Sequence, residues 1–512
     1  MRPINRGVGT TESERYLAAL ADRTFLDLWS YPNTFNDRKE HGKGNGKELT
    51  DLLVVCGDDV VIFSDKSITW PGGDDVGLSW SRWYRRAVEA SVKQIRGAER
   101  WMRRYPDRIF VDSACETPLP VELPAPDRMR IHGIAVALGA QAACSRHFND
   151  PDGSLMVNSH LKGPSHVDPT FPGQTPFAFG DVDPQGPFVH VFDETALNLV
   201  LREMDTITDF VRYLDARQAA IRQQVIGHAV SEAEILAVYL TTDIGDGEHG
   251  FPRLEQLESF GGQINLAGGM YRDFKASPAA RRKAEADRVS YAWDKLIRAF
   301  TMNVLAGTSV AVAGIEPDAR LSERSLRVMA LETRTSRRAL GEAFVGALAN
   351  AEQRGLDRFA RVVVPGEGAA DPLCGHVFLV VAFREPWMVE QGYDQYRLFR
   401  SGLLKAYCEA ALHEYRHLKR MLGVAVDAPE SRTGQKGGSE DLLLLEIDQW
   451  TPEHEREVER LRKKAGILVP ARLRRGGIHV TEFPPPPSHP RFQGNRAERR
   501  AAAVRHRRSP GR

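Results

Sequence analysis

A predicted β-hairpin near the start of the chain carries two residues of opposite charge at its open end. Asp51 precedes one apolar, β-branched-rich run and Lys66 follows another, with Gly57-Asp58-Asp59 as the turn signal between the runs. With Asp58 and Asp59 as a two-residue loop, Asp51 faces Lys66 across the strands. Ser64 shares their face because strand side chains alternate. Charged groups beside buried strands are costly without a task, and the task we expect is to hold a divalent metal ion and activate a water.

This arrangement resembles the core motif of the PD-(D/E)xK nuclease superfamily, an acid on one strand followed by acid-x-Lys on the next. Asp51 matches the first acid and Lys66 the lysine, whereas Ser64 stands where the pattern has Asp or Glu. The resemblance implies that Asp51 holds Mg²⁺ or Mn²⁺ together with a relocated carboxylate, either Glu48 or Asp65. A bulge at Ser64-Asp65 would bring Asp65 round to the face of Asp51. The departure at Ser64 leaves open a site that has lost its metal and its catalysis.

The likeness extends beyond the motif itself. Residues 46–66 also resemble uncharacterised bacterial proteins grouped with nuclease-related domains, and this resemblance covers roughly the first quarter of the chain. Residues 191–214 are similar to the same proteins, but that second likeness implies no activity for the middle of the chain.

A long basic helix is predicted after the hairpin, from Trp80 to Arg104, with apolar residues near helical spacing. In the superfamily a helix follows the motif hairpin, and in some branches it carries a glutamine that faces the active site. Gln94 matches that glutamine. The basic residues on its other face are expected to contact phosphates, the alternative being a solvated face: Arg82, Arg85, Arg86, Lys93, Arg96 and Arg100.

An amphipathic helix is predicted before the hairpin, from Ser13 to Trp29. The superfamily often has a further acid on a helix in this place, and Glu14 is the candidate. A glutamate in the first helical turn is also favoured by the helix dipole alone. The loop from Asn36 to Lys47 is expected beside the site, and we assign no role to its His41.

Composition indicates a globular chain without a membrane span. Of the 512 residues, 42% are hydrophobic, which is enough for several buried cores, and no apolar run reaches about eighteen residues. The five cysteines are scattered, without CxxC spacing. These features favour a reduced, cytoplasmic protein without structural zinc.

The net charge of +1 conceals an asymmetry. Eight arginines and one acid, Glu498, lie between Arg491 and Arg512, so this tail carries +7 and the first 490 residues carry −6. Contacts with DNA or RNA must therefore come from local patches, namely the basic helix and the tail. The tail follows Pro484 to Pro487, a stiff spacer, and is expected to be disordered.

We predict a mixed α/β protein of several domains. Residues 1–160 form a restriction-endonuclease-like nuclease domain, 188–345 a mainly helical middle domain, 346–480 an α/β unit, and 481–512 the spacer and basic tail. Strands are predicted at 108–113, 130–140 and 188–192, a helix broken near Thr206 at 193–214, and a long helix at 393–422.

A second constellation is His413-Glu-Tyr-Arg-His417, two histidines four residues apart on the last of these helices. That spacing can hold zinc, as in H-E-x-x-H, but no third ligand is evident, so a zinc hydrolase is a subordinate alternative. The leading expectation is a metal-dependent nuclease acting on DNA or RNA. Its main alternative is a catalytically degenerate nuclease fold that binds nucleic acid or a partner protein.

Overall fold

The chain folds as a mixed α/β protein, which confirms the predicted class. The computed structural model describes residues 3–38, 46–150, 153–245, 248–260, 262–366, 369–429, 439–470, 474–477 and 480–486. Their strands form one five-stranded sheet, two four-stranded sheets and one small hairpin. The basic tail and His41 lie outside the described residues. In the described part of the chain, no helix is both long enough and apolar enough to cross a membrane.

The first sheet holds the predicted motif hairpin and has the strand order β1-β2-β3-β4-β7. Neighbours are antiparallel from β1 to β3 and parallel from β3 to β7. The strands are β1 Ser30–Asn36, β2 Lys47–Cys56, β3 Asp59–Ser67, β4 Arg130–Leu138 and β7 Val189–Phe192. The last strand therefore comes from the segment assigned to the middle domain.

The hairpin turn differs by one residue from the expected one. Cys56 pairs with Asp59 and Leu52 with Phe63, so the loop is Gly57-Asp58 rather than Asp58-Asp59. Gly57 has φ +65° at the first loop position, where type II′ turns favour glycine. The register shifts by two residues as a result, and a shift of two preserves which side chains share a face.

Helices cover both faces of this sheet. The helix before the hairpin, α1 (Glu12–Thr24), packs on β1, β2 and β3, and α3 (Ala90–Arg104) packs on β2, β3 and β4. The predicted single helix from Trp80 is wrong in detail. It begins as α2 (Val76–Tyr84) and passes through a π-helical turn (Arg85–Glu89) into α3. Such a turn inserts a residue into the helix and so re-aims every side chain after it.

The predicted strand at 108–113 is also wrong. Only Phe110 makes bridges there, to Phe35 at the end of β1 and to Pro118. The predicted helix at 193–214 is confirmed with its break. It forms α5 (Glu194–Glu203), capped by Asp193, and α6 (Ile207–Arg222), capped by Thr206.

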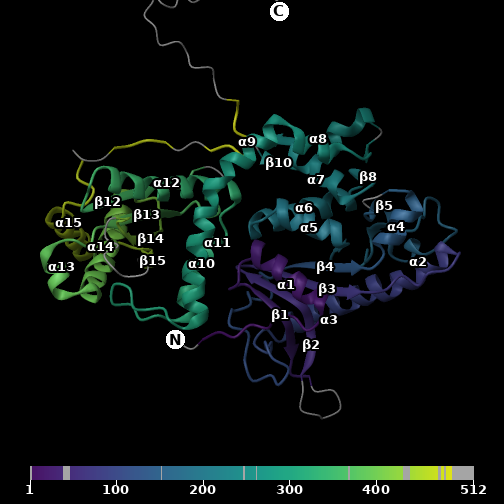
Figure 1. The fold of residues 1–512 in the computed structure, drawn as a ribbon, viewed down its shortest axis with the longest axis horizontal. Helices are drawn as coiled ribbons and strands as arrows, with labels where there is room; N and C mark the ends of the chain where they lie inside the picture. Colours follow the sequence, from purple (N-terminus) through teal and green to yellow (C-terminus); the bar gives the residue numbers. More distant parts are fainter. Residues whose placement is uncertain are drawn as a thin grey trace, which may run out of the picture.

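The second sheet and the middle helices lie beyond the first sheet (Figure 1). The sheet order is β11-β8-β5-β6. Its strands are β5 Met156–Lys162, β6 Ala178–Asp181, β8 Ile226–Ala229 and β11 Ile264–Leu266, and the small hairpin is β9 Asp243–Gly245 with β10 Glu248–His249. The helices of residues 141–353 not yet named are α4 Gln141–Phe148, α7 Glu232–Thr241, α8 Met270–Ala276, α9 Pro278–Asp287, α10 Tyr291–Ala306, α11 Ala319–Ala330 and α12 Arg334–Gln353.

The third sheet forms the C-terminal unit, with the order β12-β13-β14-β15, and lies across α10 and α11 from the first sheet (Figure 1). Its elements are β12 Arg358–Val363, β13 Cys374–Val381, α13 Pro386–Gln391, α14 Tyr393–Glu414, β14 Arg420–Asp427, β15 Glu440–Glu446 and α15 Pro452–Ala465. The helix predicted to reach Leu422 ends at Glu414, because the apolar run that follows pairs with β13 as a buried parallel strand.

Candidate metal centre at the fork of β2 and β3

Asp51 lies where β2 and β3 separate, and its side chain takes over bonds that strand pairing would otherwise make. The pairing of these strands ends at Leu52 and Phe63. Asp51 is only 4% exposed. Its Oδ2 accepts hydrogen bonds from the backbone N–H of Asp65 at 2.5 Å and from Nζ of Lys66 at 3.1 Å. The expected closeness of Asp51 and Lys66 on one face is thus confirmed.

Gln94 joins this group from α3, the helix that packs on β2, β3 and β4. Its Nε2 donates to Oδ1 of Asp51 at 2.9 Å, and its Oε1 accepts from the Ser64 hydroxyl at 2.9 Å. Ser64 is fully buried. The structure therefore brings Asp51, Ser64, Lys66 and Gln94 into one hydrogen-bonded network, in which every polar side-chain atom of Asp51 is engaged.

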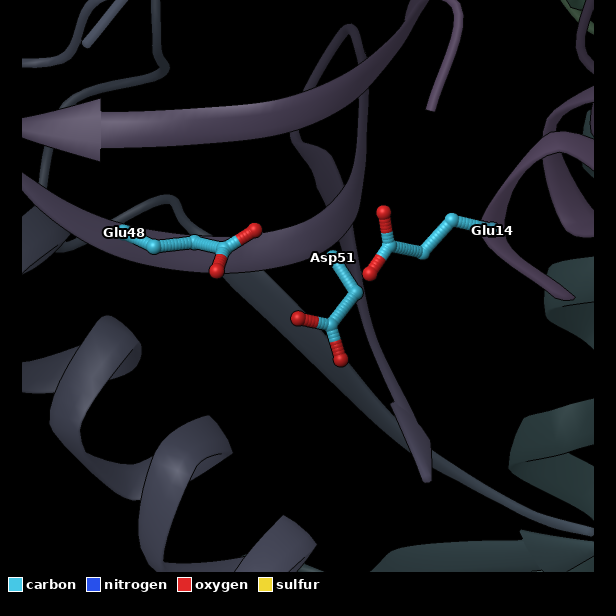
Figure 2. Close-up of side chains that lie close together, drawn as sticks. All are labelled: Glu14, Glu48 and Asp51. Atoms are coloured by element: carbon cyan, nitrogen blue, oxygen red, sulfur yellow. The ribbon is translucent and has the colours of Figure 1, made fainter. Parts of the chain in front are cut away.

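Three carboxylates converge at the open side of the network. Glu14, Glu48 and Asp51 each offer one oxygen, and these oxygens lie within 4.8 Å of one another. Figure 2 shows Glu14 and Glu48 reaching toward Asp51 from opposite sides. Oxygen donors in such a group are the ligands that hard cations such as Mg²⁺ and Mn²⁺ prefer.

Asn33 in β1 ties two of these acids together. Its Nδ2 donates to Oε2 of Glu14 at 3.0 Å and to Oε1 of Glu48 at 2.7 Å. Sequence reasoning missed Asn33, and no motif marks it. Its one unusual property, a left-handed φ of +48°, is a backbone feature that asparagine tolerates better than most residues.

Glu14 has two structural duties. Its carboxylate accepts from the backbone N–H groups of Thr10 and Thr11, and so closes a capping box at the start of α1. Burial opposes ionisation, but the hydrogen bonds from Asn33 and these amides together lower the pKa of Glu14. Glu14 is thus held as a carboxylate that points into the cluster.

Glu48 is electrostatically different from Glu14. Burial raises the pKa of Glu48, and the negative charges of Asp51 and Glu14 raise it further, while Asn33 and Lys66 act in the opposite direction. Three carboxylates against one lysine leave the centre with excess negative charge. A divalent cation would relieve that excess.

Asp65 does not join the cluster in the expected way. The bulge predicted at Ser64-Asp65 is absent, because β3 pairs with β4 without a register shift from Asp59 to Ser67. Asp65 therefore stays on the face opposite Ser64. It is 7% exposed, and neither carboxylate oxygen has a hydrogen-bond partner among the described residues. Burial, together with the charges of Asp51 and Glu14, raises the pKa of Asp65 to about 6; the nearby Ser13 hydroxyl acts in the opposite direction, although it does not meet the geometry of a hydrogen bond.

The basic residues of the long helix divide into two groups. Arg96 is engaged by Asp183 at 2.7 Å and Glu99 at 3.0 Å, and it also donates to the Pro187 carbonyl, so its expected role as a phosphate contact conflicts with its surroundings. The others are exposed and have no acidic partner in the described part of the chain: Arg82, Arg85, Arg86, Lys93 and Arg100.

The histidine pair is not arranged for zinc. His413 lies in the last turn of α14, but the helix ends at Glu414 and His417 lies beyond it, so the expected i, i+4 geometry on one helix is wrong. The His413 ring instead packs edge-on against Trp450, with ring centroids 5.3 Å apart. Among the described residues, neither histidine belongs to a group of potential metal ligands.

Comparison of the chain with protein-family models, curated proteins and solved structures finds no match.

A cavity of about 410 Å³ lies between α10, α11 and β15, remote in the fold from the carboxylate cluster, and none of the cluster residues lines it.

Proposed function

We propose that this chain is a metal-dependent nuclease that hydrolyses phosphodiester bonds at the fork of β2 and β3. The observation that carries the proposal is the convergence on Asp51 of two further carboxylates, a lysine and a glutamine, the whole group coming from four elements, α1, β2, β3 and α3. The order of helix with acid, motif hairpin, and helix with glutamine also fits the PD-(D/E)xK resemblance.

The residues present fit Mg²⁺ or Mn²⁺. Glu14, Glu48 and Asp51 supply hard oxygen donors from three directions, and the orphaned carboxylate of Asp65 adds negative charge close by. When bound, the cation polarises a water and the phosphate and offsets the charge of the reaction's transition state.

Lys66 and Gln94 supply the remaining chemistry. The Lys66 ammonium, about a quarter exposed, is placed to hold a nucleophilic water or a phosphate oxygen beside Asp51. Gln94 fixes the orientation of the Asp51 carboxylate through its bond to Oδ1. The five unpaired basic residues of α2, the π-helical turn and α3 offer phosphate contacts along the same helix.

A second candidate is a degenerate nuclease fold that binds nucleic acid without cutting it. The observation that favours it is Ser64, which occupies the position of the usual motif acid and is closed off by its hydrogen bond to Gln94. For either candidate we place the protein in the cytoplasm, since its five cysteines are scattered and without CxxC spacing.

The decisive experiment compares wild type with Asp51→Asn on labelled single-stranded, duplex and RNA substrates in Mg²⁺ or Mn²⁺. We expect cleavage by wild type that EDTA stops, and a loss of at least 100-fold in the variant, because the substitution removes the shared ligand while keeping its shape. Asp58→Asn, in the partly exposed hairpin turn at the other end of β2, is the matched control and should cut normally. If the wild-type protein cuts none of these substrates, the proposal that it is a nuclease is wrong.

A further inference from the structure

The C-terminal end of α3 carries an aromatic and arginine cluster at the margin of the core and outside the metal centre, with Trp101 packed against the core. Trp101 and Tyr105 are half-buried, with ring centroids 4.8 Å apart. Arg108 lies over both rings, 5.3 Å from the centroid of Trp101 and 4.8 Å from that of Tyr105, and Arg104 lies 5.3 Å from the centroid of Tyr105. We call these four residues the aromatic platform.

The platform is held rigidly. The indole Nε1 of Trp101 donates to the carbonyl of Arg108 at 2.9 Å, which closes the chain back onto the helix end. The guanidinium of Arg108 is anchored by Asp37, just beyond β1, at 2.8 Å. Its side chain is nevertheless 47% exposed. Layers of aromatic rings and guanidinium groups that are pre-positioned in this way can stack on bases with little loss of entropy.

The platform is continuous with the metal centre along two elements. Trp101 follows Gln94 by seven residues, two helical turns, so it lies on nearly the same face of α3, about 10 Å further along the axis. On the sheet side, Glu48 pairs with Phe35, and Phe35 pairs with Phe110, two residues after Arg108. A strand lying across this edge would therefore reach from the centre to the platform within a few nucleotides.

The local charge suits a phosphate backbone. From Arg100 to Arg108 the chain has four arginines and one acid, Asp107. Two of these arginines pair with acids outside the segment, Arg103 with Glu99 and Arg108 with Asp37. Arg100 and Arg104 are exposed and have no acidic partner among the described residues. The two aromatic rings suit unpaired bases, which a duplex keeps stacked inside its helix.

We infer that the aromatic platform binds the unpaired bases of single-stranded nucleic acid, and so directs the proposed nuclease toward single strands or single-stranded ends. The inference rests on the proposed function for its biological meaning but not for its measurement, because binding is assayed without metal. The aromatic residues discriminate single strands from duplex, whereas the arginines contribute to both through phosphate charge.

The test uses the full chain in EDTA and follows fluorescence anisotropy of labelled (dT)20 and of a 20-bp duplex at several salt concentrations. Trp101→Ala and Tyr105→Ala should each weaken (dT)20 binding at least fivefold, leave duplex binding within twofold, and leave the salt dependence unchanged. Arg100→Ala should weaken both ligands and lower the salt slope by about one. Trp387→Ala, which removes an exposed tryptophan of α13, is the matched control and should bind as wild type.

Equal effects of Trp101→Ala on both ligands, or no effect on either, would overturn the inference. Tyr105→Ala guards against misfolding of the tryptophan variant, since Tyr105 lies outside the buried core. Trp101-dependent binding of (dT)20 by a protein that never cuts would uphold the platform and reject the nuclease. Metal-dependent cleavage, together with single-strand binding that does not depend on Trp101 or Tyr105, would uphold the nuclease and reject the platform.

Discussion

Nζ of Lys66 lies 3.1 Å from Oδ2 of Asp51, although the two residues are not opposite each other in the strand pairing. Continued by one step from Leu52 and Phe63, the register would place Asp51 opposite Ser64. The strands instead separate at this point, and the Asp51 carboxylate takes the N–H of Asp65 and leans toward Lys66. The contact therefore depends on the fork and not on the ladder.

Lys66→Met tests whether the lysine acts in chemistry or only in packing. We expect cleavage to fall at least 100-fold, because no other described cation contacts Asp51. Mn²⁺ affinity, measured by calorimetry, should stay the same or rise, since lysine competes with the metal for Oδ2. Lys405→Met, at an exposed position of α14, is the matched control and should cut as wild type. Equal loss of metal binding and cleavage in Lys66→Met would argue for a structural role.

Ser64→Asp restores an acid at the position where the motif expects one. The new carboxylate would lie beside Gln94 and near Asp51, so we expect Mn²⁺ to bind several-fold more tightly. We also expect a stability loss of about 1–3 kcal/mol in the absence of metal, from burying another acid. Ser64→Asn has the same shape without the charge. If both variants bind Mn²⁺ equally, the position does not face the metal.

Asp65→Asn should stabilise the metal-free protein, and the gain should depend on pH. The pKa of Asp65 is about 6 in the folded chain and 3.8 ordinarily, so the folded state holds this proton more tightly than the unfolded state does. Wild-type stability therefore falls as the pH rises from about 4 to about 6 and stays lower above that. Asp65→Asn should not lose stability in this pH range, because asparagine does not ionise.

The free energy of unfolding of Asp65→Asn should exceed that of wild type by up to about 3 kcal/mol at pH 7, and this difference should vanish near pH 4. Urea unfolding in EDTA at several pH values measures it, with Asp58→Asn as the partly exposed control. A difference that does not change with pH would mean that Asp65 does not titrate in this range.

The sequence predicted Asp51 and Lys66 as neighbours because strand alternation tolerates an error of two residues in register. Gln94 was suggested by the resemblance to the superfamily, in which a helix directly after the hairpin can carry a glutamine. Neither could identify Asn33, whose contacts with Glu14 and Glu48 exist only after α1, β1 and β2 have packed. Nor does any residue type in Arg85–Glu89 distinguish the π-helical turn from the α-helix on either side of it.

Two other predictions are wrong because strand pairing in the folded chain overrides the local sequence pattern. Residues 415–422 continue the apolar spacing of α14, yet the segment from Arg420 becomes a strand between β13 and β15. The bulge at Ser64-Asp65 was inferred from a need for another ligand. Continuous pairing with β4 on the other side of β3 prevents it.

The fifth strand of the first sheet limits how the protein can be divided for expression. A fragment ending at residue 160 would retain Asp51, Lys66 and Gln94 but lose Val189–Phe192, the partner of Gly133–Val136 in β4. The buried, apolar β4 would then be an open edge, which invites pairing between molecules. We expect fragment 1–160 to aggregate, and size-exclusion chromatography would show it. Independent folding of the unit that carries the candidate metal centre thus requires a segment about fifty residues downstream of β4.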